Sequence, residues 1–508
     1  MRSAGTKGAG VKRGAPAMLP FFLATCVAAF YYARYAVEDP NRFLALPALL
    51  GVAVVAWVAN RWPEKAVACL PAFILLADTK FRWRDPTASL RGELDGQVML
   101  ELGLYALAGL IVAIATVRRS LRPYPSTLME VVLFGGGLVA VGSVLWSSSP
   151  KFTLVRGTQL LIVYAVGRTL VLMHGPTGSI RALTRTIVPY VVLCTVSAIL
   201  LPSTVLTYDE GDAINRFSWF GVWPTQAARF VALAGLLLLA SYVYAPDSRH
   251  RRFLGVPTPL WVFPLGGLLV LTYSRTALVA FAVAVAALVA IKYLRLWKAA
   301  LLVAVTAVVS LVFVNSAETL SALLQRGTES EGFLATVLFR GQSVEQLARL
   351  SNRVSLWDGV LQLFLDRPLL GYGYQGSRQF LLAIMPWAGH AHNALAQAAL
   401  DLGILGTVPV LLGLGRILSP RHLRMAGPMS RVVEWRATVL ALGLFLLIVS
   451  MSAESFVEPS FEALAFCLCV FSRERVREEV AAPARGRTRP AAPSALTVRE
   501  LAGPGRPA

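Results

Sequence analysis

The sequence predicts an all-α polytopic membrane protein with about 12–14 transmembrane helices and one large helical extracytoplasmic loop. Of its 508 residues, 56% are hydrophobic and 15% are charged, whereas soluble domains carry about 25% charged residues. Apolar runs of about 20 residues recur, which is the length that a helix needs to cross the hydrocarbon core. A closed β-barrel would need alternating apolar and polar residues, and runs such as 280–291 do not alternate.

Hydropathy divides the chain into two terminal tails, two groups of spans and one long loop. We expect a basic cytoplasmic tail at 1–17, transmembrane helices over 18–314, an extracytoplasmic lid at 315–391, transmembrane helices over 392–472 and a disordered basic cytoplasmic tail at 473–508. The expected spans are 18–37, 43–59, 66–77, 98–117, 127–145, 154–173, 186–201, 227–245, 258–273, 276–294, 297–314, 392–413, 436–452 and 460–472.

The distribution of charge gives the orientation in the cytoplasmic (inner) membrane. With both termini in the cytoplasm, most arginines and lysines of the short loops fall inside, as the positive-inside rule requires. Most acidic residues fall outside, although the loop at 78–97 also places four basic residues there. The formal charge of +20 therefore sits in short loops and tails, and we exclude nucleic acid as a partner.

The loop at 315–391 is far longer than any other connection, and loops of this size are usually functional or disordered. Residues 344–365 have apolar residues at helical spacing, which end at Asp366-Arg367-Pro368. The turn Gly371-Tyr372-Gly373-Tyr374 follows. We expect helices that lie against the outer membrane face as a lid.

Two of the five histidines, His390 and His392, stand where this loop meets the span that begins at 392. A neutral imidazole is the side chain best suited to take a proton near pH 7, and the start of the helix would fix the ring of His392. Ordinary interfacial polar residues are the alternative. We expect no metal, because a helix would point the two rings apart and no carboxylate cluster completes a site.

Three arginines are expected at the same membrane face. Arg275 lies between two spans with almost no loop, Arg216 lies shortly before the span at 227–245, and Arg353 lies in the lid. Guanidinium groups bind phosphate oxygens in a bidentate manner; snorkelling or structural ion pairs are the alternatives. Together with the histidines, the arginines indicate an anionic lipid-linked substrate.

Two carboxylates could orient His392, and a third, Asp401, is not expected to be its direct partner. Asp401 follows it by nine residues, which places it on the opposite face of a straight helix. Glu454 and Glu458, outside between the last two spans, are better placed.

An ordered set of motifs resembles the O-antigen ligase and O-antigen polymerase superfamily, over about residues 140–470. The motifs are His392-Asn393 followed after nine residues by Gly403-x-x-Gly406-Thr407, Ser274-Arg275 at a span junction, Arg353-x-x-x-Trp357, Pro368-Leu369-Leu370-Gly371-Tyr372-Gly373, and 216–224. Val408 stands where the ligase pattern often has a second threonine, so the resemblance does not separate ligase from polymerase.

The resemblance implies a membrane glycosyltransferase that takes a glycan from undecaprenyl diphosphate and passes it to an acceptor hydroxyl of a glycan, lipid or protein. Arg216 and Arg275 would clamp the diphosphate, His392 would be the base, and Asn393 or His390 would place the acceptor. No metal or other cofactor is implied. The alternatives are a polymerase of the same superfamily and a polysaccharide flippase; a transporter would gather its ionisable groups near the bilayer midplane and often contain an internal repeat.

Overall fold

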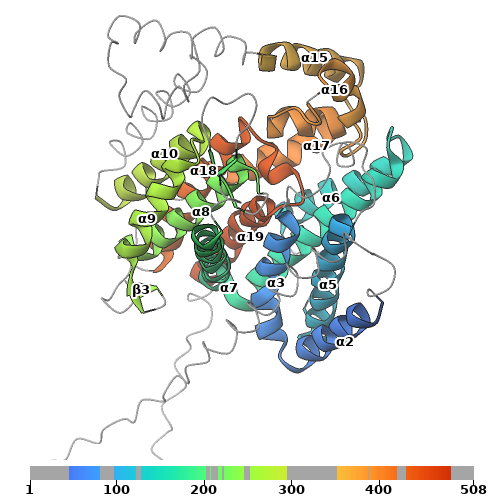
Figure 1. Ribbon diagram of the computed structural model, residues 1–508. Coiled ribbons are helices and arrows are strands. Elements are labelled where there is room, and N and C mark those ends of the chain that lie inside the picture. The colour runs from blue at the N-terminus through green and yellow to red at the C-terminus, as the bar shows by residue number, and fades with distance from the viewer. Residues whose placement is uncertain are drawn as a thin grey trace, which may run out of the picture.

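The computed structural model is mostly helical (Figure 1), and it describes residues 45–79, 96–121, 127–201, 206–207, 216–219, 222–244, 252–253, 255–293, 352–386, 388–419 and 431–481. Within these residues, six helices are long and apolar enough to cross a membrane. This confirms the predicted class, a multi-pass membrane protein. The expected spans 18–37 and 297–314, the tail at 1–17 and residues 315–351 of the lid lie outside the described residues.

The helices follow the predicted spans closely. They are α2 Ala45–Arg61, α3 Pro63–Asp78, α5 Gly96–Arg118, α6 Leu128–Gly142, α7 Pro150–Leu200, α8 Pro224–Val243, α9 Thr258–Leu271, α10 Arg275–Tyr293, α15 Asn352–Asp366, α16 Arg378–Ile384, α17 Ala394–Leu418, α18 Arg431–Ser450 and α19 Phe461–Ala481, with short 3-10 turns η1 Ser143–Leu145 and η5 Ser455–Val457. Two short antiparallel pairs accompany them: β1 Leu206–Thr207 with β2 Arg216–Phe217, and β3 Arg252–Phe253 with β4 Val256–Pro257.

Two helix boundaries differ from the prediction. No loop separates the expected spans 154–173 and 186–201, because the chain bends at Gly175 (φ +67°) and the helix resumes directly at Pro176; proline suits a first helical turn. Helix α19 continues to Ala481, beyond position 472 where the disordered tail was expected. Residues 473–481 contain no glycine or proline, and the first proline follows at Pro483.

Side-chain contacts join the loops into two groups, one at each end of the bundle. At one end, called here the histidine end because it carries His390 and His392, the α6–α7 connection binds the segment 367–376: Trp146 Nε1 donates to Leu370 O (3.0 Å) and Ser148 Oγ to Gly376 O (2.6 Å). At the opposite end, Arg119 forms an ion pair with Glu64. Each group contains only loops that the charge pattern assigns to one side of the membrane.

Helix α17 is broken at Gly403, which has φ +60°. In a regular helix the amide of Ile404 would donate to Leu400 O; here Ile404 N donates to Pro368 O (2.9 Å) and Leu400 O accepts from Tyr372 N (2.9 Å). A backbone group left without a partner in the hydrocarbon region would cost several kcal/mol. The Pro368–Tyr372 segment therefore supplies both hydrogen bonds that the break removes, which ties two of the motifs into one structural unit.

Substitution Gly403→Ala should destabilise the protein. A Cβ there would meet the backbone of Leu369 at 2.3 Å, and the positive φ adds strain; such strain costs about 1–3 kcal/mol before the clash is added. Gly415→Ala in the same helix is the control, because its Cβ would meet nothing within 4 Å. Thermal unfolding in detergent measures both variants, and equal melting temperatures would contradict the structural role of Gly403.

The orientation can be tested by labelling single cysteines in a chain whose native cysteines are replaced by alanine. Gln379 in α16 is exposed at the histidine end, and Ser120 is exposed at the opposite end. A membrane-impermeant maleimide should label Gln379→Cys in intact spheroplasts and Ser120→Cys only after permeabilisation. The reverse pattern would invert the proposed topology.

Candidate functional site

The backbone between the two histidines is held from both sides. The amide of Ala391 donates to Gln397 Oε1 (2.8 Å), and the carbonyl of Ala391 accepts from Trp357 Nε1 (3.1 Å). Trp357 belongs to α15, which with α16 lies beside the start of α17 (Figure 1). Arg353 lies one turn earlier in α15, and its side chain is outside the described part of the structure. One residue of the lid thus fixes the loop that carries both imidazoles.

A buried polar network inside α17 supports Gln397. Its Nε2 donates to Asp401 Oδ2 (3.0 Å) and to Ser377 Oγ (3.1 Å), and Ser377 Oγ donates to Asp401 Oδ1 (2.6 Å). Asp401 and Gln397 are 1% exposed. Asp401 therefore reaches the histidine loop through Gln397, since it holds the amide that binds Ala391. The sequence did contain a signal, because two polar residues four apart in an apolar span are rarely accidental.

The histidines themselves lie outside the helix, contrary to expectation. Helix α17 begins at Ala394, after Asn393, whose Oδ1 accepts from the amides of Leu395 (3.0 Å) and Ala396 (3.1 Å) as the N-cap. His392 has φ +51°, a conformation that is uncommon for residues with a side chain and often marks a functional site. The expected helical separation does not apply: the two rings lie together, with centroids 4.0 Å apart and planes tilted by 48°.

The carboxylate of Glu454 contacts Nδ1 of His390. The prediction that Glu454 or Glu458 orients His392 stays a prediction, and the contact that the structure gives Glu454 is with the neighbouring His390. Glu454 is 4% exposed and immediately precedes η5, whereas the imidazole of His390 is 37% exposed. A buried carboxylate therefore lies beneath an accessible imidazole.

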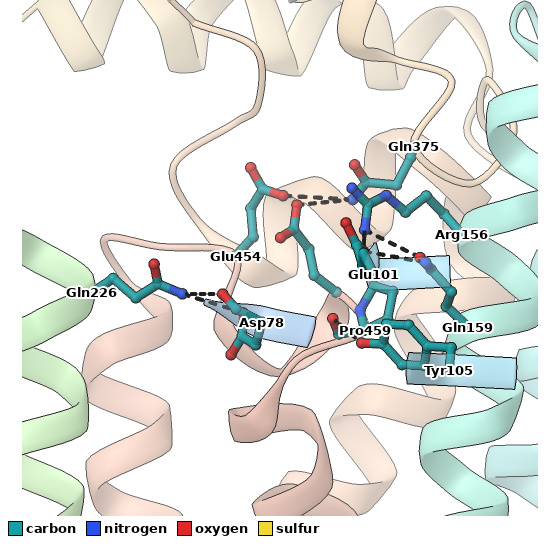
Figure 2. A network of polar contacts seen from close by, with 10 residues as sticks. Asp78, Glu101, Tyr105, Arg156, Gln159, Gln226, Gln375, Glu454 and Pro459 are labelled. Carbon is teal, nitrogen blue, oxygen red and sulfur yellow. Dashed lines mark hydrogen bonds and ion pairs between the residues drawn. The ribbon is translucent and has the colours of Figure 1, made fainter. Parts of the chain in front are cut away.

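A wider polar network surrounds this carboxylate (Figure 2). Gln375 Nε2 donates to Glu458 Oε1 (3.2 Å) and makes a longer contact with Glu454 Oε2 (3.5 Å). Nearby, Arg156 pairs with Glu101 and donates to Gln159 Oε1 (3.1 Å). These side chains lie at the histidine end, where Tyr105 Oη of α5 also donates to Pro459 O (2.8 Å) and so holds the 454–459 loop against α5.

Tyr374 fixes the same loop from the lid side. Its hydroxyl donates to Val457 O (2.7 Å), and its amide donates to Ser143 Oγ (2.9 Å). Burial raises the pKa of Tyr374 well above its ordinary value. The phenol therefore stays neutral and remains a hydrogen-bond donor at physiological pH.

Arg216 and Arg275 meet at the junction between α9 and α10. Arg216 is 5% exposed, and its Nε donates to Thr272 O (3.1 Å). Thr272 lies three residues before Arg275, which is partly buried and opens α10. The N-terminus of a helix carries partial positive charge and favours anions. Two guanidinium-bearing segments and a helix N-terminus thus lie in one region, while the binding roles of both arginines remain predictions.

The arginine junction lies at the histidine end of the bundle. Helix α8 begins there, because Arg229 pairs with Glu462 (3.1 Å) at the start of α19 and Gln226 Nε2 binds Asp78 O (2.6 Å). It ends beside the end of α10, where Tyr244 Oη donates to Leu288 O (3.1 Å). The start of α10, with Arg275, must therefore lie at the same end as His390 and His392.

A further arginine near the histidines was not singled out from the sequence. The guanidinium of Arg378 in α16 lies over Gly389, where a Cβ would meet its Cζ at 3.2 Å. Gly389 precedes His390, so this glycine admits a cation beside the histidine loop. No sequence signal marked Arg378, since it lies in a polar segment where arginine is common.

The described residues contain no group of three or more histidine, cysteine, aspartate or glutamate side chains that could hold a metal ion. The expectation that the protein needs no metal or other cofactor stays a prediction.

Residues 260–411 match the family described as O-antigen ligase. This segment includes Arg275, Arg353, His390, His392 and Asn393. No curated protein and no solved structure matches the chain. The family consists of ligase- and polymerase-type enzymes that act on lipid-linked glycans. The chain is thus a multi-pass membrane protein whose residues 260–411 match the O-antigen ligase family.

Proposed function

We propose that the protein transfers a glycan from an undecaprenyl-diphosphate-linked donor to an acceptor hydroxyl at the outer face of the cytoplasmic membrane. The observation that carries this proposal is the carboxylate-contacted histidine pair, at the same end of the bundle as the Arg216–Arg275 junction. An acid–base group and a cationic region are the two elements that such a transfer requires.

The transfer forms one bond and breaks one. The acceptor oxygen bonds to the anomeric carbon of the donor sugar, and the bond between that carbon and the diphosphate oxygen breaks. The acceptor proton passes to His392, and undecaprenyl diphosphate leaves with the electron pair of the broken bond. Charge develops on the leaving diphosphate, so fixed cations stabilise the transition state more than the ground state.

Arg216 and Arg275 supply those cations in this proposal. Arg216 is held by Thr272 O, so its guanidinium is oriented before the donor binds and little conformational entropy is lost on binding. The N-terminus of α10 adds a partial charge of the same sign. Arg353 and Arg378, on α15 and α16, are further cations on the lid side.

His392 is the proposed base, with His390 and Asn393 near the acceptor. Oδ1 of Asn393 caps α17, so acceptor contact would fall to its amide nitrogen. A flippase receives less support, because the described polar groups that this proposal uses gather at one end of the bundle rather than at its midplane.

Arg275→Ala should reduce transfer roughly a hundredfold or more, as loss of one charge-stabilising donor typically does. Arg275→Lys should recover part of the rate, because an ammonium group cannot bind bidentately. The assay uses purified protein and the lipid-linked glycan that accumulates in a strain lacking this protein. Arg185→Ala, at an exposed arginine of α7, is the control; parent-like rates in both Arg275 variants would remove the clamp.

His392→Ala should lower transfer by about 10²–10⁴-fold while the binding of undecaprenyl diphosphate survives, because a positioned base typically contributes that factor. His390→Ala should cost less, and His174→Ala, whose ring contacts Glu64 O (3.1 Å) at the opposite end, should cost nothing. The parent rate should fall as pH drops through the range where imidazole protonates, about 6–7. A ladder of products would indicate a polymerase and a single added glycan a ligase, whereas parent-like transfer by His392→Ala would refute the base assignment.

A further inference from the structure

We propose that Glu454 is a positioning residue for the histidine pair: its carboxylate holds His390 against His392 and balances the charge that arises when the pair takes the acceptor proton. The inference rests on the proposed function and assigns a role to a residue outside the matched segment 260–411.

The geometry forms a short chain of contacts from the core to the accessible rings. Glu454 is 4% exposed and contacts His390 Nδ1. The ring of His390 in turn lies 4.0 Å, centroid to centroid, from the ring of His392. His392 has the positive φ that a residue adopts only when its surroundings hold it there. The ring of His390 is one of those surroundings, and Glu454 contacts that ring.

The contact also has chemical consequences. A carboxylate in contact with Nδ1 favours the tautomer with the proton on that nitrogen, which leaves Nε2 with the lone pair. It thereby outweighs the longer contact in which the amide of His392 donates to Nδ1 (3.4 Å). The carboxylate also stabilises an imidazolium, as the aspartate of a serine-protease triad does without taking the proton itself. Because Glu454 is buried, solvent screens this interaction only weakly.

The surroundings of Glu454 favour a role beyond packing. Glu458 shares Gln375 with it, so two carboxylates approach one neutral amide, and Glu101 adds a third nearby (Figure 2). Arg156 is the guanidinium that pairs with Glu101 in this network. Burying carboxylates near one another is costly unless cations or hydrogen bonds compensate, and a proton on the histidine pair would supply such compensation.

Several charged or titratable groups surround His390 and bear on its protonation. Glu454 contacts it from the 454–459 loop, and Glu458 lies behind Gln375. His392 faces it from the same loop, and Arg378 reaches over Gly389 from α16. Arg378 opposes protonation of the pair and both glutamates favour it, so removing the carboxylate of Glu454 should shift the balance toward neutral imidazole.

Glu454→Gln keeps the shape and removes the charge. The kcat for transfer should fall roughly 10- to 100-fold, the usual effect of losing such a supporting partner. The KM for the lipid-linked donor should stay near the parent value, because the arginines bind it. The acidic limb of the pH–rate profile should move to lower pH, since an imidazolium loses its counter-charge. Glu454→Asp should restore the parent pH limb with only part of the rate.

The matched control is Glu458→Gln, which makes the same change in the same loop beside the same Gln375. It should move the pH limb much less than Glu454→Gln does, because Glu458 lies behind Gln375 whereas Glu454 contacts His390. Melting temperature and binding of undecaprenyl diphosphate are measured for each variant. If Glu454→Gln does not fold, the kcat of Glu454→Asp is compared with that of the parent instead, and a reduced kcat supports the inference. A Glu454 variant with the parent kcat and pH limb overturns the inference. If the Glu454 variant is parent-like but His392→Ala transfers slowly, only the role of Glu454 is refuted and the proposed function survives. If His392→Ala also transfers at the parent rate, the assignment of His392 as the base fails as well.

Discussion

The site depends on satisfying the backbone where α17 breaks. A helix break costs free energy when it leaves an amide and a carbonyl without hydrogen-bond partners in an apolar environment. Here the Pro368–Tyr372 segment accepts a hydrogen bond from the amide of Ile404 and donates one to the carbonyl of Leu400. Gly371 and Gly403 make this possible, because a Cβ on either would meet the opposing backbone at 2.4 Å or less. The break thereby fixes the lid segment to the helix that follows the histidines through backbone atoms.

Once that join is made, the histidine loop has little freedom. Its central peptide groups are bound by Gln397 from below and by Trp357 from the lid, and the Ser377–Asp401 pair holds Gln397. Asn393 ends the loop by capping α17. Side chains with catalytic roles are best held on such a supported framework, because misplacement by about 1 Å can cost a hundredfold in rate. The positive φ of His392 is sustained by these contacts.

Hydropathy and charge were sufficient for the membrane class, and the described helices follow the expected spans because burial in hydrocarbon depends mainly on composition. The motifs also located the histidines and arginines that the bundle gathers at one end. The helix period failed at His390 and His392, since their backbone is not helical and their rings face each other. The contact of Glu454 with His390 was not predicted for the same reason. The hydrogen bond from the amide of Tyr372 to the carbonyl of Leu400 joins backbone atoms, so it could not be predicted from the side chains of these two residues.

The cost of burying charge in the membrane explains where the polar groups lie. Ionised groups in the hydrocarbon region are expensive unless they pair or reach water, so a bundle that must hold carboxylates and guanidiniums places them at its ends. At the opposite end the Arg119–Glu64 pair is exposed and contributes little to stability. At the histidine end, Glu454 and Arg216 are almost fully buried. Toward the opposite end, the buried Arg168–Glu130 pair (3.2 Å) compensates its own charges. Glu454 instead lies beneath an accessible imidazole whose charge changes when it takes a proton, so its burial indicates a chemical requirement at the histidine end.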